Sequence, residues 1–225
     1  MSEEQRLVLD YIRSGSNVVV DACAGSGKST TILSVAKELT GKRILQFTYN
    51  SMLRHEIKEK VREDRLTNME VHTYHSFAVK YYSTNAHTDT GIRHMLRDGK
   101  CPRKPIELAD IVVLDEAQDM TTLYFELIIN MAKDMCSKEN PNNKKGDHKF
   151  QLLVLGDYMQ GLYEFKGADI RFLTQASEVW KDLPYLENNI FKSCNLRTSY
   201  RVTNQMAEFV NKDMLGEDRL LACKE

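Results

Sequence analysis

The sequence predicts an α/β fold in which a parallel sheet is covered by helices on both faces. Short apolar runs alternate with longer segments in which apolar residues recur at helical spacing. The short runs are apolar at successive positions, which is typical of strands buried on both faces. Such alternation favours right-handed crossovers and therefore a parallel sheet. With 225 residues, the chain can form one large domain, with or without a small appendage.

Five segments are expected to be strands, and three are expected to be helices. The strands are Val18–Val20, Ile44–Phe47, Ile111–Leu114, Leu152–Leu155 and, with a weaker pattern, Ser193–Leu196. Helical spacing of apolar residues is found within residues 32–39, 52–61 and 123–135.

Two segments depart from this alternation. Residues 79–109 contain several glycines and prolines, with helical spacing only near Ile92–Arg97, so we expect a small insertion or subdomain there. Residues 137–149 are polar and rich in turn formers, which predicts an exposed, mobile loop. The lysines of this loop would also suit a basic contact site, but a solvated loop is the preferred interpretation.

The segment Asp-Ala-Cys-Ala-Gly-Ser-Gly-Lys-Ser-Thr, residues 21–30, has the pattern of a phosphate-binding loop. It follows a predicted strand and precedes a predicted helix, as such a loop requires. Small residues let backbone N–H groups surround phosphates, and the helix N-terminus adds partial positive charge. Lys28 would contact the β- and γ-phosphates, and the Ser29 hydroxyl would ligate Mg²⁺. Ala22 replaces the first glycine of the general pattern, and a chance glycine turn is the alternative. The residues expected around the phosphates are Ala24, Gly25, Ser26, Gly27, Lys28, Ser29 and Thr30.

Two carboxylates follow the predicted strand Ile111–Leu114, in the segment Asp-Glu-Ala-Gln-Asp. Ligands bind at the carboxyl ends of parallel strands, where the phosphate loop also lies. We therefore expect Asp115 to hold Mg²⁺ with Ser29, and Glu116 to activate the water that attacks the γ-phosphate. The alternative is that both carboxylates only stabilise the start of a helix.

A third polar segment follows the predicted strand Leu152–Leu155. Gln160 can both donate and accept hydrogen bonds, which makes it a candidate sensor of the γ-phosphate. Tyr163, Phe165 and Lys166 follow it closely, and aromatic rings beside a cation suit base stacking on a single strand. On these residues alone, burial of both rings in the core is the preferred alternative.

The composition excludes several classes of protein. The sequence contains 31 Lys and Arg residues and 32 Asp and Glu residues, so that its charges nearly cancel. Any basic surface that contacts nucleic acid must therefore be local. No apolar run approaches the length of a membrane span, and the polar N-terminus is not a secretory signal. Five scattered cysteines without a C-x-x-C pair argue against structural zinc and favour a reducing intracellular compartment.

Taken in order, these motifs resemble those of the UvrD/Rep-like superfamily 1A DNA helicases along nearly the whole chain. Further matching segments are Phe-Thr-Tyr-Asn at 47–50, His-Thr-Tyr-His-Ser-Phe at 72–77 and Asn-Leu-Arg-Thr-Ser-Tyr-Arg at 195–201. The segment between His75 and Asp115 is short, a layout closer to the F-box DNA helicases and some viral relatives. The resemblance implies a first RecA-like motor domain of the P-loop NTPase fold, with the second RecA-like domain absent.

The resemblance also implies what the domain binds. ATP and Mg²⁺ would be its cofactors and single-stranded DNA its partner, with movement from 3′ to 5′ in the full-length enzyme. Gln5 and Tyr200 would hold the adenine, and Arg201 would meet the γ-phosphate. The implied catalytic residues are Lys28, Glu116, Gln160 and Arg201.

The residues that the resemblance places at the DNA come from three segments. They are Phe47, Thr48 and Asn50; Thr73, Tyr74 and His75; and Tyr163, Phe165 and Lys166. Phe165 replaces the usual Trp and Lys166 the usual Arg, which preserves stacking and charge with less strength.

Two alternatives remain open at this point. One is a fragment that binds nucleotide and single strands without unwinding, and DNA-stimulated ATP hydrolysis would argue against it. The other is an RNA helicase of the same superfamily, which a comparison of DNA with RNA would separate. We expect a monomer with no membrane association and an intracellular location, either nuclear or cytoplasmic; the resemblance also admits a viral source.

Overall fold

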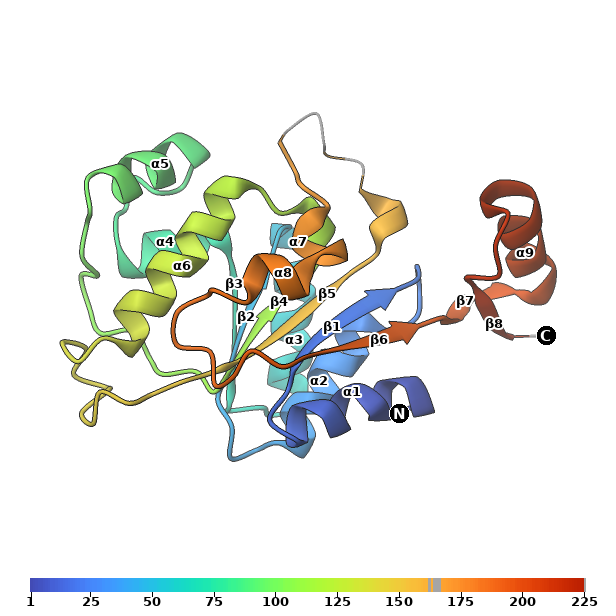
Figure 1. Cartoon of the computed structure of the whole chain (residues 1–225), viewed down its shortest axis with the longest axis horizontal. Coiled ribbons are helices and arrows are strands. Elements are labelled where there is room, and N and C mark those ends of the chain that lie inside the picture. Colours follow the sequence, from blue (N-terminus) through green and yellow to red (C-terminus); the bar gives the residue numbers. More distant parts are fainter. Residues whose placement is uncertain (162, 164–166, 225) are drawn as a thin grey trace.

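The computed structural model describes residues 1–161, 163 and 167–224 (Figure 1). Its centre is a six-stranded parallel sheet with strand order β3-β2-β4-β5-β1-β6. The strands are β1 (Asn17–Ala22), β2 (Ile44–Thr48), β3 (Met69–Thr73), β4 (Ile111–Leu114), β5 (Gln151–Gly156) and β6 (Phe191–Leu196). All five predicted strands are present, and β3 is an additional one.

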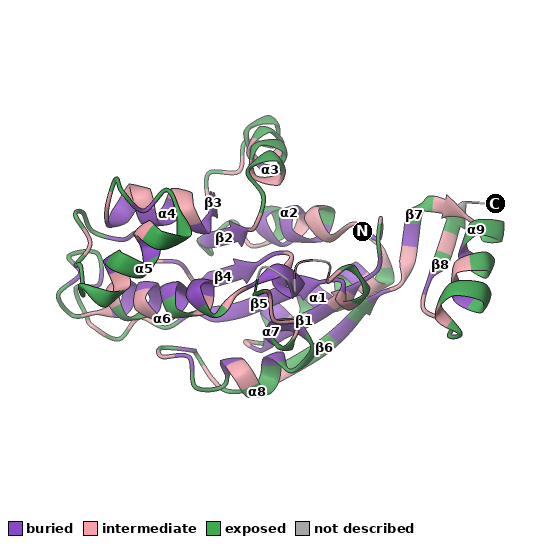
Figure 2. Cartoon of the chain, turned by 90° about the horizontal axis from the view of Figure 1, so that it is seen from above, coloured by how far each residue is buried: buried purple, intermediate pink, exposed green. Residues whose placement is uncertain are grey.

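Helices cover both faces of this sheet, which confirms the predicted α/β fold class. One face carries α1 (Glu3–Arg13), α2 (Lys28–Glu38) and α3 (Ser51–Glu63). The other face carries α4 (Tyr74–Tyr81), α5 (Asp89–Arg97), α6 (Thr122–Cys136), α7 (Arg171–Thr174) and α8 (Ala176–Trp180). Strand side chains alternate between the two cores, so that Val18 and Val20 face α1 and α2 while Val19 faces the other way. Figure 2 shows the central strands of this sheet buried between the two helical layers.

A small second sheet follows β6. Strands β7 (Thr198–Thr203) and β8 (Leu221–Lys224) pair in parallel, and α9 (Asn204–Phe209) and a π-helical turn (Val210–Leu215) lie between them in the chain. We call residues 198–224 the C-terminal unit. Figure 1 shows it projecting beyond the end of β6. Its Ala207 and Leu220 pack on Cys23 of the phosphate loop, so the unit is in contact with the main domain.

Residues 79–109, expected to be a small insertion or subdomain, share the core of the main domain. Tyr81, Tyr82, Ile92 and Met95 are buried in the same cluster as the side chains of α6. Helix α5 lies where helical spacing was expected, and it packs on α6.

The segment 137–149 is exposed at most positions, as expected, but two of its asparagines hold it to the end of α6. Asn140 and Asn143 are buried. The Asn140 amide donates to Met135 O at 2.7 Å, and the Asn143 amide donates to Cys136 O at 2.8 Å. These carbonyls belong to the last turn of α6, which has no intrahelical donors for them. The two asparagines therefore anchor the loop at its centre.

Strand β3 forms one edge of the main sheet, and a charged cluster lies on it. Glu70 pairs with Lys80 and lies 3.8 Å from Arg43 Nη2. Burial raises the pKa of Glu70, but hydrogen bonds from His72 and Lys80 outweigh it and lower the pKa to about 2. Glu70 is therefore ionised at neutral pH.

Among the described residues, no helix is long and apolar enough to cross a membrane.

Candidate functional site

A cavity of about 570 Å³ lies at the carboxyl edge of the main sheet. The predicted nucleotide residues that line it are Gln5, Ala24, Gly25, Ser26, Gly27, Lys28, Ser29, Thr30, Glu116, Gln160, Tyr200 and Arg201. They come from α1, the phosphate loop, the ends of β4 and β5, and β7. Leu53, Glu56 and Lys60 of α3 also line the cavity, and no sequence pattern predicts them there.

The phosphate loop is packed tightly against β7. Gly25 has a φ of +74°, and a Cβ at this position would lie 2.8 Å from Arg201 Cγ and from Ser199 Oγ. Tyr200 N donates to Gly25 O at 3.0 Å, and Ser199 Oγ donates to Ala24 O at 2.9 Å. Glycine is therefore required at position 25 both by backbone conformation and by space.

Helix α1 positions Gln5 over the same loop. Ser2 and Gln5 form a capping box, in which Ser2 N donates to Gln5 Oε1 at 3.0 Å and Gln5 N donates to Ser2 Oγ at 3.2 Å. A Cβ at Gly27, where φ is +89°, would lie 2.8 Å from Gln5 Nε2. The side chain of Gln5 thus closes one wall of the cavity.

Lys28 and Glu116 face each other across the cavity. Lys28 Nζ lies 3.5 Å from Glu116 Oε2, and both side chains are largely buried. Glu116 has a φ of +54°, a conformation that a non-glycine residue adopts at a cost and that is concentrated at functional sites. Gln118 Nε2 donates to the same Glu116 oxygen at 2.9 Å, and Gln118 Oε1 accepts from Asp157 N at 3.1 Å. Gln118 thereby joins the ends of β4 and β5, a role that no sequence signal assigned to it.

Asp115 is buried beside this pair. Its Oδ2 accepts from Gln46 Nε2 at 3.1 Å, and its Oδ1 accepts from Glu116 N at 3.1 Å. Burial, together with the nearby charge of Glu116, raises the pKa of Asp115 to about 7. A cation close to this carboxylate would favour its charged form.

The residues present fit a Mg·nucleotide. Ser29 and Asp115 offer hydroxyl and carboxylate oxygens, which are the donors that Mg²⁺ prefers. Ser26 Oγ is buried in the loop and has no hydrogen-bond partner among the described residues, which leaves a donor available to a ligand. The two glycines with positive φ keep the loop open to phosphate oxygens.

Gln160 reaches the cavity from the short 3₁₀ turn Tyr158–Gln160 that follows β5. Its Nε2 donates to Asp157 Oδ2 at 2.6 Å. Asp157 Oδ1 also accepts from Met159 N at 3.1 Å, so the carboxylate defines the shape of this turn.

An aromatic series runs from the main core towards this edge of the sheet. Tyr163 stacks on Tyr49 with centroids 5.6 Å apart, Tyr49 meets the edge of Tyr124 at 6.2 Å, and Tyr124 stacks on Tyr74 at 4.3 Å. Phe47 follows at 5.5 Å from Tyr74. Tyr49 and Tyr163 are partly exposed, whereas the other members are buried.

This series corrects part of the predicted DNA face. Phe47, Thr48 and Tyr74 are buried, so their side chains cannot contact a strand. Phe47 and Tyr74 occupy the buried end of the series because their positions on β2 and at the start of α4 point into the core. Tyr49, which we had not selected, occupies the accessible end; its place directly after a strand was the signal available in the sequence.

The other predicted DNA residues have local partners. Thr73 is buried and caps α4, and Asn50 caps α3 by accepting from Met52 N at 2.8 Å. His75 Nε2 lies 2.9 Å from Asp89 Oδ1 with the ring partly exposed. Phe165 and Lys166 lie outside the described residues.

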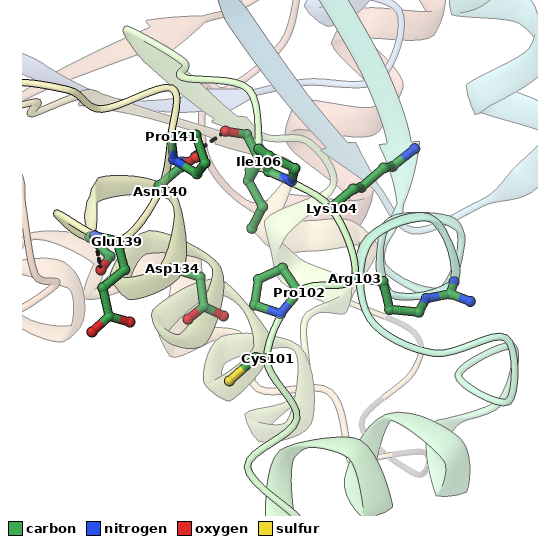
Figure 3. A pocket seen from close by; sticks show the side chains of 11 residues that line it. Cys101, Pro102, Arg103, Lys104, Ile106, Asp134, Glu139, Asn140 and Pro141 are labelled. Carbon is green, nitrogen blue, oxygen red and sulfur yellow. Dashed lines mark hydrogen bonds between the residues drawn. The ribbon is translucent and has the colours of Figure 1, made fainter.

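A second cavity, of about 320 Å³, lies near the carboxyl end of α6. Figure 3 shows Asp134 and Glu139 on the opposite side of it from Arg103 and Lys104. No residue of the phosphate loop or of the strand ends lines it, so the first cavity is the candidate functional site.

The buried carboxyl of Asp119 predicts a pH-dependent stability. Burial, with the charge of Glu116, raises the pKa of Asp119 to about 6, and its Oδ1 has no hydrogen-bond partner among the described residues. A raised carboxyl pKa contributes stability at low pH that is lost as the pH rises through about 6. As the pH rises from 4 to 8, we expect the free energy of unfolding of Asp119→Asn to increase by about 1–3 kcal/mol relative to that of wild type.

Melting temperatures measured across that pH range would test this. Asp147→Asn, at an exposed carboxylate, is the matched control and should follow the wild-type curve. A difference between Asp119→Asn and wild type that does not change with pH would contradict the assignment.

Comparison with known proteins gives one family match and several similar structures. The AAA domain family matches residues 5–166, well over half of the chain. The crystal structure of Pif1 helicase from Candida albicans superposes with a TM-score of 0.53 and 18% identity, over 89% of this chain and 40% of that one. Unliganded Pif1 from Bacteroides sp gives a TM-score of 0.53 and 16% identity, over 93% of this chain and 44% of that one.

A structure of Pif1 helicases described as unwinding forked double-stranded DNA gives a TM-score of 0.55 and 17% identity, over 93% of this chain and 46% of that one. This chain thus spans less than half the length of these helicases. No curated protein matches it. The chain therefore belongs to the AAA domain family, and it shares the α/β fold of the Pif1 helicase structures.

Proposed function

We propose that this chain is the ATP-hydrolysing motor domain of a DNA helicase, which binds Mg·ATP in the 570 Å³ cavity and single-stranded DNA beside it. The observation that carries the proposal is the convergence of five chain segments on one cavity. Each segment supplies a group suited to one part of a nucleoside triphosphate. A chance glycine turn gives no reason for Gln5, Glu116, Gln160 and Arg201 to line the same cavity as the loop.

The proposed chemistry follows from the contacts of Lys28 and Glu116. Glu116 Oε2 is held by both Lys28 and Gln118. An entering γ-phosphate competes for Lys28, while Gln118 keeps the carboxylate in place. Glu116 is then free to accept a proton from the attacking water. Arg201, which lines the same cavity, adds positive charge at the phosphates.

Bound Mg²⁺ would neutralise phosphate charge, with Ser29 and Asp115 as the residues that hold it. Tyr200 is 40% exposed and lines the cavity with Gln5, so these two side chains are proposed to hold the adenine. Gln160 is proposed to report the γ-phosphate, because its turn connects the cavity to Tyr163.

The proposed strand contact is the stacked pair Tyr49 and Tyr163. Base–aromatic stacking is sequence-tolerant and contributes roughly 1–3 kcal/mol per base. The pair follows β2 and the Gln160 turn, so it lies at the same sheet edge as the nucleotide residues. With a net charge of −1, the chain cannot rely on bulk electrostatics, and local stacking therefore matters more.

We expect Tyr163→Ala to weaken single-stranded DNA binding by roughly 5- to 150-fold, because one stacking surface is lost. Affinity for Mg·ATP should remain within a few-fold of wild type. Fluorescence anisotropy with a labelled oligonucleotide and calorimetry with Mg·ATP measure the two quantities. Tyr185→Ala, which removes an exposed ring near the amino end of β5, is the control.

Measuring ATP hydrolysis with each nucleic acid decides between DNA and RNA. Hydrolysis that single-stranded DNA stimulates more than RNA supports the proposal, and the reverse order identifies an RNA helicase. Equal DNA binding by Tyr163→Ala and wild type would remove the stacking assignment. Because the chain spans less than half of the Pif1 structures, unwinding and 3′ to 5′ movement are proposed only for a protein that also carries a second RecA-like domain.

A further inference from the structure

Arg219, in the loop before β8, lies between the ends of two central strands. Its Nη2 donates to Asp21 Oδ1 and to Asp157 Oδ1, at 2.8 Å each. Asp21 is in β1, next to the phosphate loop, and Asp157 follows β5. The guanidinium also lies 4.2 Å from the centroid of the Tyr158 ring. Only 10% of the Arg219 side chain is exposed, so this is a buried ion pair.

Asp157 joins Arg219 to the nucleotide cavity. Its Oδ1 accepts from Arg219, while its Oδ2 accepts from Gln160 Nε2 at 2.6 Å. Its side chain is 3% exposed, so its orientation depends on these partners. A second contact also joins Arg219 to the cavity: Cys23 Sγ of the phosphate loop donates to Arg219 O at 3.4 Å.

We propose that Arg219 is a positioning residue, which holds Asp157 and, through it, Gln160 in place, and so couples the C-terminal unit to the nucleotide cavity. The expected effect of Arg219 on ATP hydrolysis rests on the proposed function, whereas its expected effect on the position of Gln160 does not. Without the guanidinium, Asp21 and Asp157 would be two neighbouring carboxylates with no cation between them. Their repulsion would turn Asp157 away from Gln160.

The chain offers a matched pair of variants. Arg197 donates to Arg219 O at 3.2 Å and also to Asp218 O, so it holds the same loop. It has no contact with Asp21 or Asp157 among the bonds of the described residues. Arg219→Met and Arg197→Met therefore both loosen the loop, but only the first removes the cation from the two carboxylates.

The first measurement needs no nucleotide. We expect the side-chain amide NMR signal of Gln160, assigned with Gln160→Ala, to shift in Arg219→Met and to remain in place in Arg197→Met. Arg219→Lys should restore it, because an ammonium can lie between the same two carboxylates. The second measurement is single-turnover ATP hydrolysis, which should fall roughly 3- to 30-fold in Arg219→Met at unchanged Mg·ATP affinity.

The outcomes separate the positioning role of Arg219 from the proposed function. If the Gln160 signal shifts as expected but the wild-type chain does not bind Mg·ATP, the coupling stands and the proposed function fails. If Arg219→Met and Arg197→Met move the signal equally, Arg219 only docks the loop and the inference is overturned. A Gln160 signal that is unaltered in Arg219→Met overturns it as well. If Arg219→Met is too unstable to study, a wild-type signal for Gln160 in Arg219→Lys supports the inference, and a displaced one contradicts it.

Discussion

Glu116→Gln is expected to reduce ATP hydrolysis by roughly 10²- to 10⁴-fold, because the amide cannot accept the proton that the attacking water releases. The substitution keeps the size of the side chain and its contact with Gln118. Affinity for Mg·ATP should therefore stay within a few-fold of wild type. Single-turnover hydrolysis in the presence of single-stranded DNA, together with calorimetry, separates the loss of chemistry from a loss of binding.

Glu126→Gln is the control for that experiment, since Glu126 is exposed on α6 and does not line the cavity. It should hydrolyse ATP at the wild-type rate. Undiminished hydrolysis by Glu116→Gln would mean that this carboxylate only begins the 3₁₀ turn Ala117–Asp119. Its left-handed conformation would then need an explanation other than catalysis.

Lys28→Met should weaken Mg·ATP binding by about 10- to 150-fold. Hydrogen bonds to charged groups contribute roughly 1.5–3 kcal/mol, and each 1.4 kcal/mol corresponds to a factor of ten. Hydrolysis should fall at least in proportion, because the same ammonium is proposed to neutralise charge that develops on the phosphates. Titration calorimetry with Mg·ATP measures the affinity directly.

Lys37→Met provides the comparison, because Lys37 lies on the same helix and pairs with Asp64 on the surface at 2.8 Å. It should bind Mg·ATP as wild type does. The melting temperature of Lys28→Met should remain close to that of wild type, so that weak binding cannot be attributed to unfolding. Wild-type affinity in Lys28→Met would rule out the phosphate loop as the nucleotide site.

Much of the main domain could be predicted because its strands are buried on both faces and therefore apolar at successive positions. Strand β3 was missed, since its sequence alternates Met69 and Val71 with the polar Glu70 and His72 and is less apolar than a central strand. Strand β7 was missed for a related reason: Tyr200 and Arg201 are exposed on it, and it belongs to a small sheet with little core. Edge and peripheral strands carry a weaker hydrophobic pattern than central ones.

The candidate site was predictable where its residues follow strand ends, and not where it depends on contacts across the fold. The phosphate loop, Glu116 and Gln160 each come within a few residues of the end of an apolar run, and parallel topology brings such positions together. Gln118 and Arg219 act through partners that are distant in the chain, and no local pattern marks them. The burial of Phe47 likewise depends on the helices that cover both faces of β2 and bury every residue of that strand, which a motif match does not report.

The charged cluster on β3 has a consequence for solubility. An unprotected edge strand offers unpaired backbone groups to other chains, and an ionised side chain on it discourages such pairing because docking would strip its water. Glu70, kept ionised by His72 and Lys80, stands in the middle of this strand, far along the sheet from β1 and its phosphate loop. A chain neutralised at this position would retain its nucleotide cavity and still be more prone to assemble edge to edge into aggregates. The side chains of this cluster therefore oppose edge-to-edge pairing of two chains, a task separate from any turnover of ATP.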